Sequence, residues 1–151
     1  MKNYCSYKDL YAALKSNKTS CVQQTNLYLK KIKKQKNLNA FSEVFEKTAL
    51  ESSRKIDEKI KKGTHGMLAG MVVAIKDNIC YQGHKISASS KILENFESIY
   101  SATVIEKLLK EDAIIIGRLN CDEFAMGSAN ENSIYGPVLN PHNKRKVAGG
   151  S

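Results

Sequence analysis

Apolar positions recur at helical spacing through the first sixty residues of the chain. Residues 7–15 predict a short helix, and residues 20–35 predict a second one with a stripe of period 3.6. A third helix is expected to end near Gly63, because glycine is typical just past the last helical residue. Residues 40–45 predict a short strand between the last two helices. The expected buried positions are Cys21, Thr25, Tyr28, Leu29 and Ile32 in the second helix, and Ala49, Ser53, Ile56 and Ile60 in the third.

The pattern changes after residues 63–66, where glycines and short apolar runs replace the lysine-rich helices. Residues 71–75 predict a buried strand, and residues 113–116 predict another that ends at Gly117. Between them, residues 102–111 predict a helix. Strand, helix and strand in this order indicate a parallel pair with a right-handed connection.

Two details of that crossover helix can be predicted as well. Its inward positions are expected to be Ile105, Leu108 and Leu109. Thr103 and Glu106 have the spacing of a capping box at its start.

The two patterns together predict an α/β fold. A basic helical segment, residues 1–62, is followed by residues 63–151, the start of a mixed, largely parallel sheet covered by helices. With 151 residues and 42% hydrophobic content, the chain can bury an ordinary core. No apolar run approaches the roughly 18 residues that a membrane span needs, and the start does not resemble a signal peptide. We therefore expect a cytoplasmic protein with no membrane contact.

The positive charge is concentrated at the N-terminal end. The net charge is +9, and the first 62 residues hold 15 Lys and Arg against 6 Asp and Glu, whereas the remainder holds 9 of each. Lysines near the end of the second predicted helix complement the helix dipole. Two interpretations of this surface stay open: a solvated polar face, or contact with an acidic partner or RNA. No aromatic residues alternate with these lysines, as base stacking would require.

The cysteines and histidines show no metal-ligand spacing, so we predict no metal site in this chain. No pair of cysteines forms a C-x-x-C motif, and reduced thiols are expected. The residues concerned are Cys5, Cys21, Cys80, Cys121, His65, His84 and His142.

Lys76 is the leading candidate for chemistry, because it closes the apolar run of residues 71–75. Sites in parallel sheets lie beyond the carboxyl ends of the strands. A lysine accepts a proton only when neutral, and from a reference pKa near 10.4 that takes a shift of about 3 units, or about 4 kcal/mol. Burial beside the apolar run would act in that direction. The alternative is that Lys76 is simply the first solvated residue after the strand.

Three motifs occur in order along the chain: residues 70–78 (GMVVAIKDN), residues 122–128 (DEFAMGS) and residues 149–151 (GGS). Together they resemble the amidase signature family. Within it, residues 120–137 are most similar to the A subunits of glutamyl-tRNA(Gln) or aspartyl-tRNA(Asn) amidotransferases, and residues 89–93 add to the resemblance. The chain departs from the family pattern at Ala148, where proline is usual, and at His84 and Ile86.

The resemblance implies a catalytic triad of a serine, a cis-serine and a lysine. It assigns the lysine to Lys76 and the bridging cis-serine to Ser151, and it implies that the nucleophile lies beyond residue 151 in a longer protein. The chain alone is therefore expected to be inactive. A neutral amine that takes a proton through an intervening hydroxyl can activate a serine without histidine.

Two neighbouring segments have expected roles beside the triad. Met126, Gly127 and Ser128 are expected to line the substrate pocket, because glycine permits close backbone approach and the polar groups beside it can orient an amide. Asp77 and Asn78 are expected either to cap the turn that follows the strand or to orient Lys76.

The same resemblance implies a function. The protein would hydrolyse glutamine through an acyl-enzyme, and a partner subunit would use the ammonia to amidate misacylated Glu-tRNA(Gln) or Asp-tRNA(Asn). The implied partners are the B and C subunits of a heterotrimer, with ATP and magnesium bound by the partner and no cofactor in this chain. Two alternatives stay open: a stand-alone amidase of the same family, and a non-catalytic module whose lysine-rich helices bind RNA.

Overall fold

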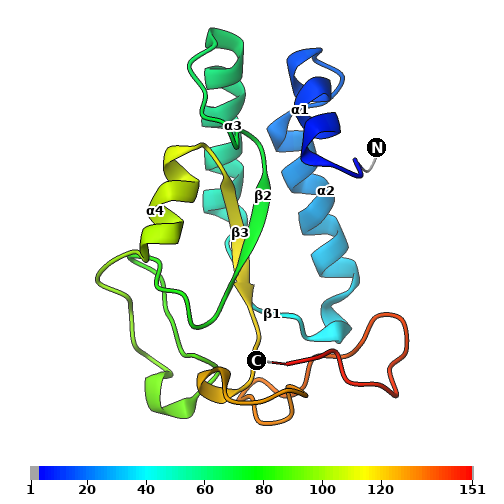
Figure 1. The fold of residues 1–151 in the computed structure, drawn as a ribbon, viewed down its shortest axis with the longest axis vertical. Coiled ribbons are helices and arrows are strands. Elements are labelled where there is room, and N and C mark those ends of the chain that lie inside the picture. The colour runs from blue at the N-terminus through cyan, green and yellow to red at the C-terminus, as the bar shows by residue number, and fades with distance from the viewer. Residues whose placement is uncertain (1–3, 151) are drawn as a thin grey trace.

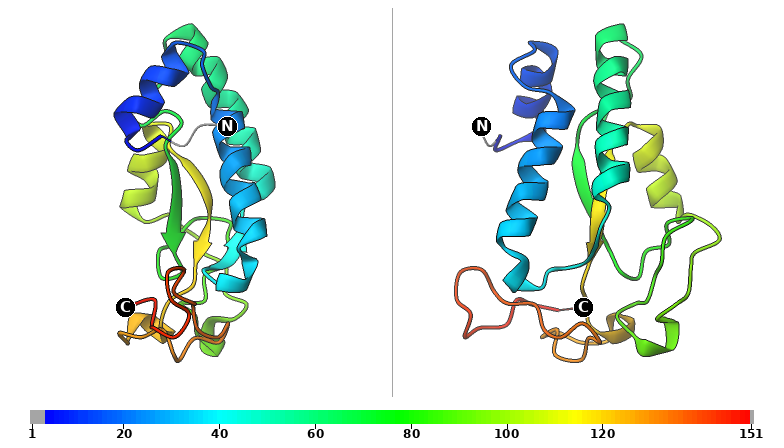
Figure 2. Two further views of the ribbon diagram at one scale, coloured as in Figure 1. Left: turned by 90° about the vertical axis from the view of Figure 1, so that its right-hand side faces the viewer. Right: turned by 180° about the vertical axis from the view of Figure 1, so that it is seen from behind.

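Three strands form a sheet with helices on both faces in the computed structural model, which describes residues 4–150. Helices α2 and α3 cover one face, and α4 lies on the other (Figures 1 and 2). The elements are α1 (Tyr7–Lys15), α2 (Cys21–Lys34), β1 (Phe41–Val44), α3 (Glu46–Lys62), β2 (Val72–Lys76), α4 (Thr103–Lys110) and β3 (Ile114–Leu119), with 3-10 turns η1 (Lys36–Leu38), η2 (Lys91–Leu93) and η3 (Glu123–Ala125).

The sheet has the order β1-β3-β2, so β3 is its central strand. β2 and β3 are parallel and are joined through α4, which confirms the predicted parallel pair. β1 pairs with β3 in the antiparallel direction, which makes the sheet mixed. The carboxyl ends of β2 and β3 therefore lie at the same edge of the sheet, where the loops of the C-terminal third gather (Figure 1).

Two hydrophobic clusters lie on the two faces of the sheet. The first joins α1, α2 and α3 to β3, and the second joins α4 to β2 and β3. The division of the chain after residue 62 stays a prediction, although the first cluster draws residues from both sides of it. The buried members of the first cluster are Leu10, Leu14, Cys21, Leu29, Ala49, Ile56, Ala69, Ile114 and Ile116, and those of the second are Phe45, Ile75, Ile105 and Ile115.

The predicted helices are confirmed, with small errors at side chains and caps. Residues 7–15 form α1 as predicted, and Gly63 follows α3 in the left-handed conformation. Leu109 and Tyr28, both expected to be buried, are 37% exposed. The capping box is also wrong, since Ala102 occupies the N-cap of α4 and no side chain caps the helix.

The predicted end of the last strand is wrong. β3 does not stop at Gly117 but continues to Leu119. A Cβ on Gly117 would lie 2.5 Å from the carbonyl oxygen of Glu43 and 3.0 Å from the ring of Phe41. The glycine is therefore needed for the close approach of β1, not to end the strand.

None of the helices within residues 4–150 is long and apolar enough to cross a membrane.

Candidate functional site

Lys76 is the last residue of β2 and pairs with Leu119, the last residue of β3. Its half-buried side chain lines a cavity of about 300 Å³ at the carboxyl edge of the sheet. Within residues 4–150, the amine of Lys76 has no hydrogen-bond or ion-pair partner, so it is available to a group that enters the cavity. The cavity is lined by Lys76, Leu119, Asn120, Cys121, Asn130, Val138, Ala148, Gly149 and Gly150.

The C-terminal glycines, Gly149 and Gly150, also line this cavity. Gly150 packs so tightly against the backbone of Ser128 that an added Cβ would overlap it. The contact holds the segment that leads into residue 151 beside Lys76. Ser151 itself lies outside the described residues, so its predicted bridging role stays a prediction.

The segment Met126, Gly127 and Ser128 lies near the cavity but does not line it. The Met126 side chain is 76% exposed. A Cβ on Gly127 would overlap the carboxylate of Asp122, which is buried beneath this segment. The expected contribution of these three residues to a substrate pocket stays a prediction.

Asp77 directly follows Lys76 and is the centre of a buried polar cluster, which we call the Asp77 cluster. Its carboxylate accepts hydrogen bonds from the Ser87 amide at 3.3 Å, from the Ser87 hydroxyl at 2.5 Å and from the Ser89 amide at 2.9 Å. We had expected Asp77 to cap the next turn or to orient Lys76. Its carboxylate instead bonds to Ser87 and Ser89, and makes no direct bond to Lys76. Its partners lie ten and twelve residues later in the chain.

Arg118 completes the Asp77 cluster from β3. Its Nε lies 3.5 Å from the Asp77 carboxylate, and its Nη1 donates to the carbonyl of Ile79 at 3.1 Å. The Ser87 hydroxyl also lies 2.8 Å from the hydroxyl of Tyr135. Burial lowers the pKa of Arg118, and the charge of Asp77 opposes that shift. Within residues 4–150, the buried Nε and Nη2 of Arg118 have no hydrogen-bond partner, so the pair relies on the charge attraction to Asp77 and on the single bond from Nη1.

Asn120 connects three loops at the same edge of the sheet. Its carbonyl oxygen accepts from the hydroxyls of Ser89 and Ser133, at 3.3 and 2.6 Å. Its amide nitrogen donates to the carbonyls of Asn39 and Gly136, at 3.1 and 2.9 Å. Sequence reasoning placed Asn120 within a family-like segment but gave it no role, because its four partners are spread over almost a hundred residues.

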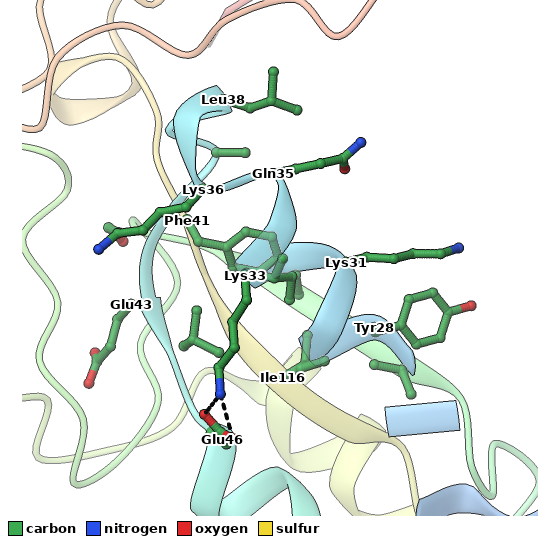
Figure 3. A pocket seen from close by; sticks show the side chains of 16 residues that line it. Tyr28, Lys31, Lys33, Gln35, Lys36, Leu38, Phe41, Glu43, Glu46 and Ile116 are labelled. Carbon is green, nitrogen blue, oxygen red and sulfur yellow. Dashed lines mark hydrogen bonds and ion pairs between the residues drawn. The ribbon is translucent and has the colours of Figure 1, made fainter. Parts of the chain in front are cut away.

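A larger groove of about 550 Å³ lies beneath the end of α2, between that helix and the sheet (Figure 3). Lysines stand at its rim, where the ammonium of Lys33 pairs with Glu46, and Phe41 and Ile116 contribute to its apolar lining. No candidate catalytic residue lines this groove. Within residues 4–150, no group of three or more His, Cys, Asp or Glu side chains is arranged to hold a metal ion.

Comparison with known sequences gives consistent matches. A sequence model of the Amidase family matches residues 23–151. The A subunit of the glutamyl-tRNA(Gln) amidotransferase from Chlorobium phaeobacteroides is 49% identical over 150 residues, which are 99% of this chain and 32% of that relative. The corresponding protein of Salinibacter ruber is 46% identical over 98% of this chain and 29% of the relative. The chain thus spans about a third of the length of the curated relatives it matches.

Solved structures show the same fold. A chain from a vestigial protein complex, described as revealing the evolutionary origins of an s-triazine catabolic enzyme, matches with a TM-score of 0.91 and 31% identity, over 97% of this chain and 33% of that one. The A subunit of the glutamyl-tRNA(Gln) amidotransferase from Thermotoga maritima matches with a TM-score of 0.55 and 45% identity, over 58% of this chain and 19% of that one. A bacterial aryl acylamidase, with a TM-score of 0.90 over 97% of this chain and 31% of that one, supports the fold alone at 24% identity.

The helix-covered mixed sheet has the fold of the N-terminal part of amidase signature enzymes. This chain belongs to the Amidase family.

Proposed function

We propose that the protein is the glutamine-hydrolysing subunit of a tRNA-dependent amidotransferase, with Lys76 as the proton acceptor and Ser151 as the bridging hydroxyl. The observation that carries the proposal is the cavity that Lys76 shares with Gly149 and Gly150. An amine without a partner inside residues 4–150 faces the segment that leads directly into Ser151. The 49% identity to the A subunit of a glutamyl-tRNA(Gln) amidotransferase favours glutamine over other amides.

The chemistry proceeds by acyl transfer. A serine from a later segment of the longer protein attacks the side-chain amide carbon of glutamine, and its proton passes through the Ser151 hydroxyl to the amine of Lys76. The proton then returns to the leaving nitrogen, which departs as ammonia and leaves a glutamyl ester on the serine. Water hydrolyses that ester to glutamate by the same proton path.

The ammonia is used by the partner subunit to amidate Glu-tRNA(Gln), or Asp-tRNA(Asn), in a cytoplasmic heterotrimer with the B and C subunits. ATP and magnesium act at the partner. This chain contributes the lysine and the bridging serine, and the later part of the protein contributes the nucleophile. For that reason the 151-residue chain alone is expected to release no ammonia from glutamine.

The test replaces Lys76 with methionine in the complete protein, assembled with its partner subunits. Methionine keeps the length and the apolar stem but cannot accept a proton. Ammonia release from glutamine is expected to fall by about 10²- to 10⁴-fold, the usual contribution of a general base. Lys91→Met, an exposed lysine in η2, is the matched control and should keep wild-type activity.

Near wild-type ammonia release by the Lys76→Met complex would refute the assignment of the base, and so would glutamine turnover by the 151-residue chain alone. The partner subunits separate the two enzymatic alternatives. A stand-alone amidase would act on other small amides without them, whereas the proposed subunit should release more ammonia when they and misacylated tRNA are present.

A further inference from the structure

Two groups of side chains lie close together at the carboxyl edge of the parallel pair. Lys76 and Leu119 line the cavity described above. Asp77 and Arg118, their neighbours in sequence, line a separate cavity of about 130 Å³ together with Ser87 and others. Successive residues of a strand face opposite sides of the sheet, so the Asp77 cluster lies behind the candidate site.

The Lys76 side chain depends on its backbone for its direction. Its amine has no hydrogen-bond or ion-pair partner among residues 4–150, so no contact at its tip fixes it. The backbone around it is fixed instead. The Asp77 amide donates to the Leu119 carbonyl at 3.0 Å, and the Ile79 amide donates to the Lys76 carbonyl at 3.0 Å.

The carboxylate of Asp77 adds hydrogen bonds and an ion pair that hold the carboxyl edge of the sheet in place. It is 1% exposed, and its partners come from the loop that holds Ser87 and Ser89 and from Arg118 on β3. The Ala88 amide also donates to the Asp77 carbonyl at 3.0 Å. One side chain thus joins the end of β2, the end of β3 and the loop between them.

The same hydrogen-bonded cluster reaches two other residues that line the Lys76 cavity. The Ser89 amide donates to the Asp77 carboxylate, while the Ser89 hydroxyl donates to Asn120 and accepts from the amide of Cys121 at 3.2 Å. Asn120 and Cys121 both line the cavity. A shift of the Asp77 carboxylate would therefore move Lys76 relative to Asn120 and Cys121 in the candidate site.

We propose that Asp77, held by Arg118, Ser87 and Ser89, is the positioning residue that sets the direction of Lys76. This inference rests on the proposed function of Lys76 as the proton acceptor. Asp77 does not itself face the reacting atoms. A misplacement of about 1 Å at a reacting group can cost about 100-fold in rate, so loss of this support should lower the rate of the chemical step.

The test compares two buried aspartates at opposite ends of β3. Asp112, close to the amino end of β3, accepts from the ammonium of Lys59 at 2.6 Å and from the Gly66 amide at 2.8 Å. Like Asp77, it is buried, forms one ion pair and accepts a hydrogen bond from the backbone. Asp112→Asn is therefore the matched control for Asp77→Asn. Both are made in the complete protein, assembled with its partner subunits.

Asp77→Asn is expected to lower kcat for ammonia release from glutamine by about 10- to 100-fold, with little change in KM. Asp112→Asn should lower Tm about as much as Asp77→Asn does, but it should leave kcat and KM close to wild type. A kcat within twofold of wild type for Asp77→Asn, or an equal fall in kcat for both variants, would overturn the proposal. A wild-type complex that releases no ammonia would overturn the proposed function itself. An active wild-type complex with an unaffected Asp77→Asn variant would overturn only the inference about Asp77.

A gentler variant covers the case in which Asp77→Asn does not fold. Tyr135→Phe removes only the hydroxyl that lies 2.8 Å from the Ser87 hydroxyl, and the Tyr135 side chain is partly exposed. It should leave Tm unchanged and lower kcat by up to about 10-fold relative to the wild type, again without a change in KM. Unchanged kcat in both Tyr135→Phe and Ser87→Ala would overturn the proposal.

Discussion

At the residue scale, Gly117 shows how one missing side chain permits a strand pairing. It lies within β3 opposite Val44, and the Glu43 carbonyl and the Phe41 ring occupy the space where a Cβ would stand. The sequence pattern suggested a strand end here, because glycine usually weakens a strand. The actual reason for the glycine is contact with a strand more than seventy residues earlier, which no local pattern reveals.

Gly117→Ala is expected to destabilise the protein by about 1–3 kcal/mol, the usual cost of overpacking. The cost arises because the nearest atom is backbone and cannot rotate away. Urea unfolding followed by circular dichroism would measure it. Gly63→Asn is the control, because nothing lies within 4 Å of that position and asparagine tolerates the left-handed backbone after α3. Equal stability losses in the two variants would contradict the steric explanation.

The Asp77 cluster, like Gly117, depends on contacts between residues far apart in the sequence. Lys76 could be singled out from the sequence, since an apolar run that ends in lysine is a local signal. The partners of Asp77 could not, because Ser87, Ser89 and Arg118 reach it only after the loop has folded back and β3 has paired with β2. A buried carboxylate has to be paired, but the sequence does not say by which residues.

At the element scale, the helices were predictable because their signals are local. α1 and α2 begin after Ser6 and Ser20, whose hydroxyls accept from backbone amides of the first turn. α3 ends at Gly63 for an equally local reason. The way α1 docks was not predictable. Tyr7 donates its hydroxyl to the Met67 carbonyl at 2.7 Å, sixty residues away in the chain.

This docking predicts a loss of stability at alkaline pH. Burial, with a smaller contribution from Tyr11 and Cys21, raises the pKa of Tyr7 to about 12. The folded pKa exceeds the unfolded value near 10, so the contribution of Tyr7 is complete below about pH 10 and is lost as pH rises towards 12. Urea midpoints measured from about pH 8 to about pH 12 should fall less steeply for Tyr7→Phe than for the wild type. An identical slope for the two proteins would contradict this account of α1.

At the scale of the whole molecule, the distribution of charge changes at residue 62, but the hydrophobic core extends across that position. The excess of positive charge lies entirely within residues 1–62. The sheet and the hydrophobic core include residues from both sides of residue 62. β1 pairs with β3, and α1, α2 and α3 share a cluster with Ile114 and Ile116. Removing the basic segment would therefore expose one face and one edge of the central strand.

We expect the 151-residue chain to unfold in a single cooperative transition, and residues 63–151 alone to remain unfolded. Far-ultraviolet dichroism reports the helices, and near-ultraviolet dichroism reports the seven tyrosines, which occur on both sides of residue 62 while tryptophan is absent. The two signals should share one urea midpoint, as two-state unfolding requires. Separate midpoints, or dispersed amide resonances from residues 63–151 alone, would instead establish two independent units. The basic helices could act as a detachable RNA-binding module only if the two units fold independently. The same measurement therefore decides whether RNA binding can be tested with residues 1–62 in isolation.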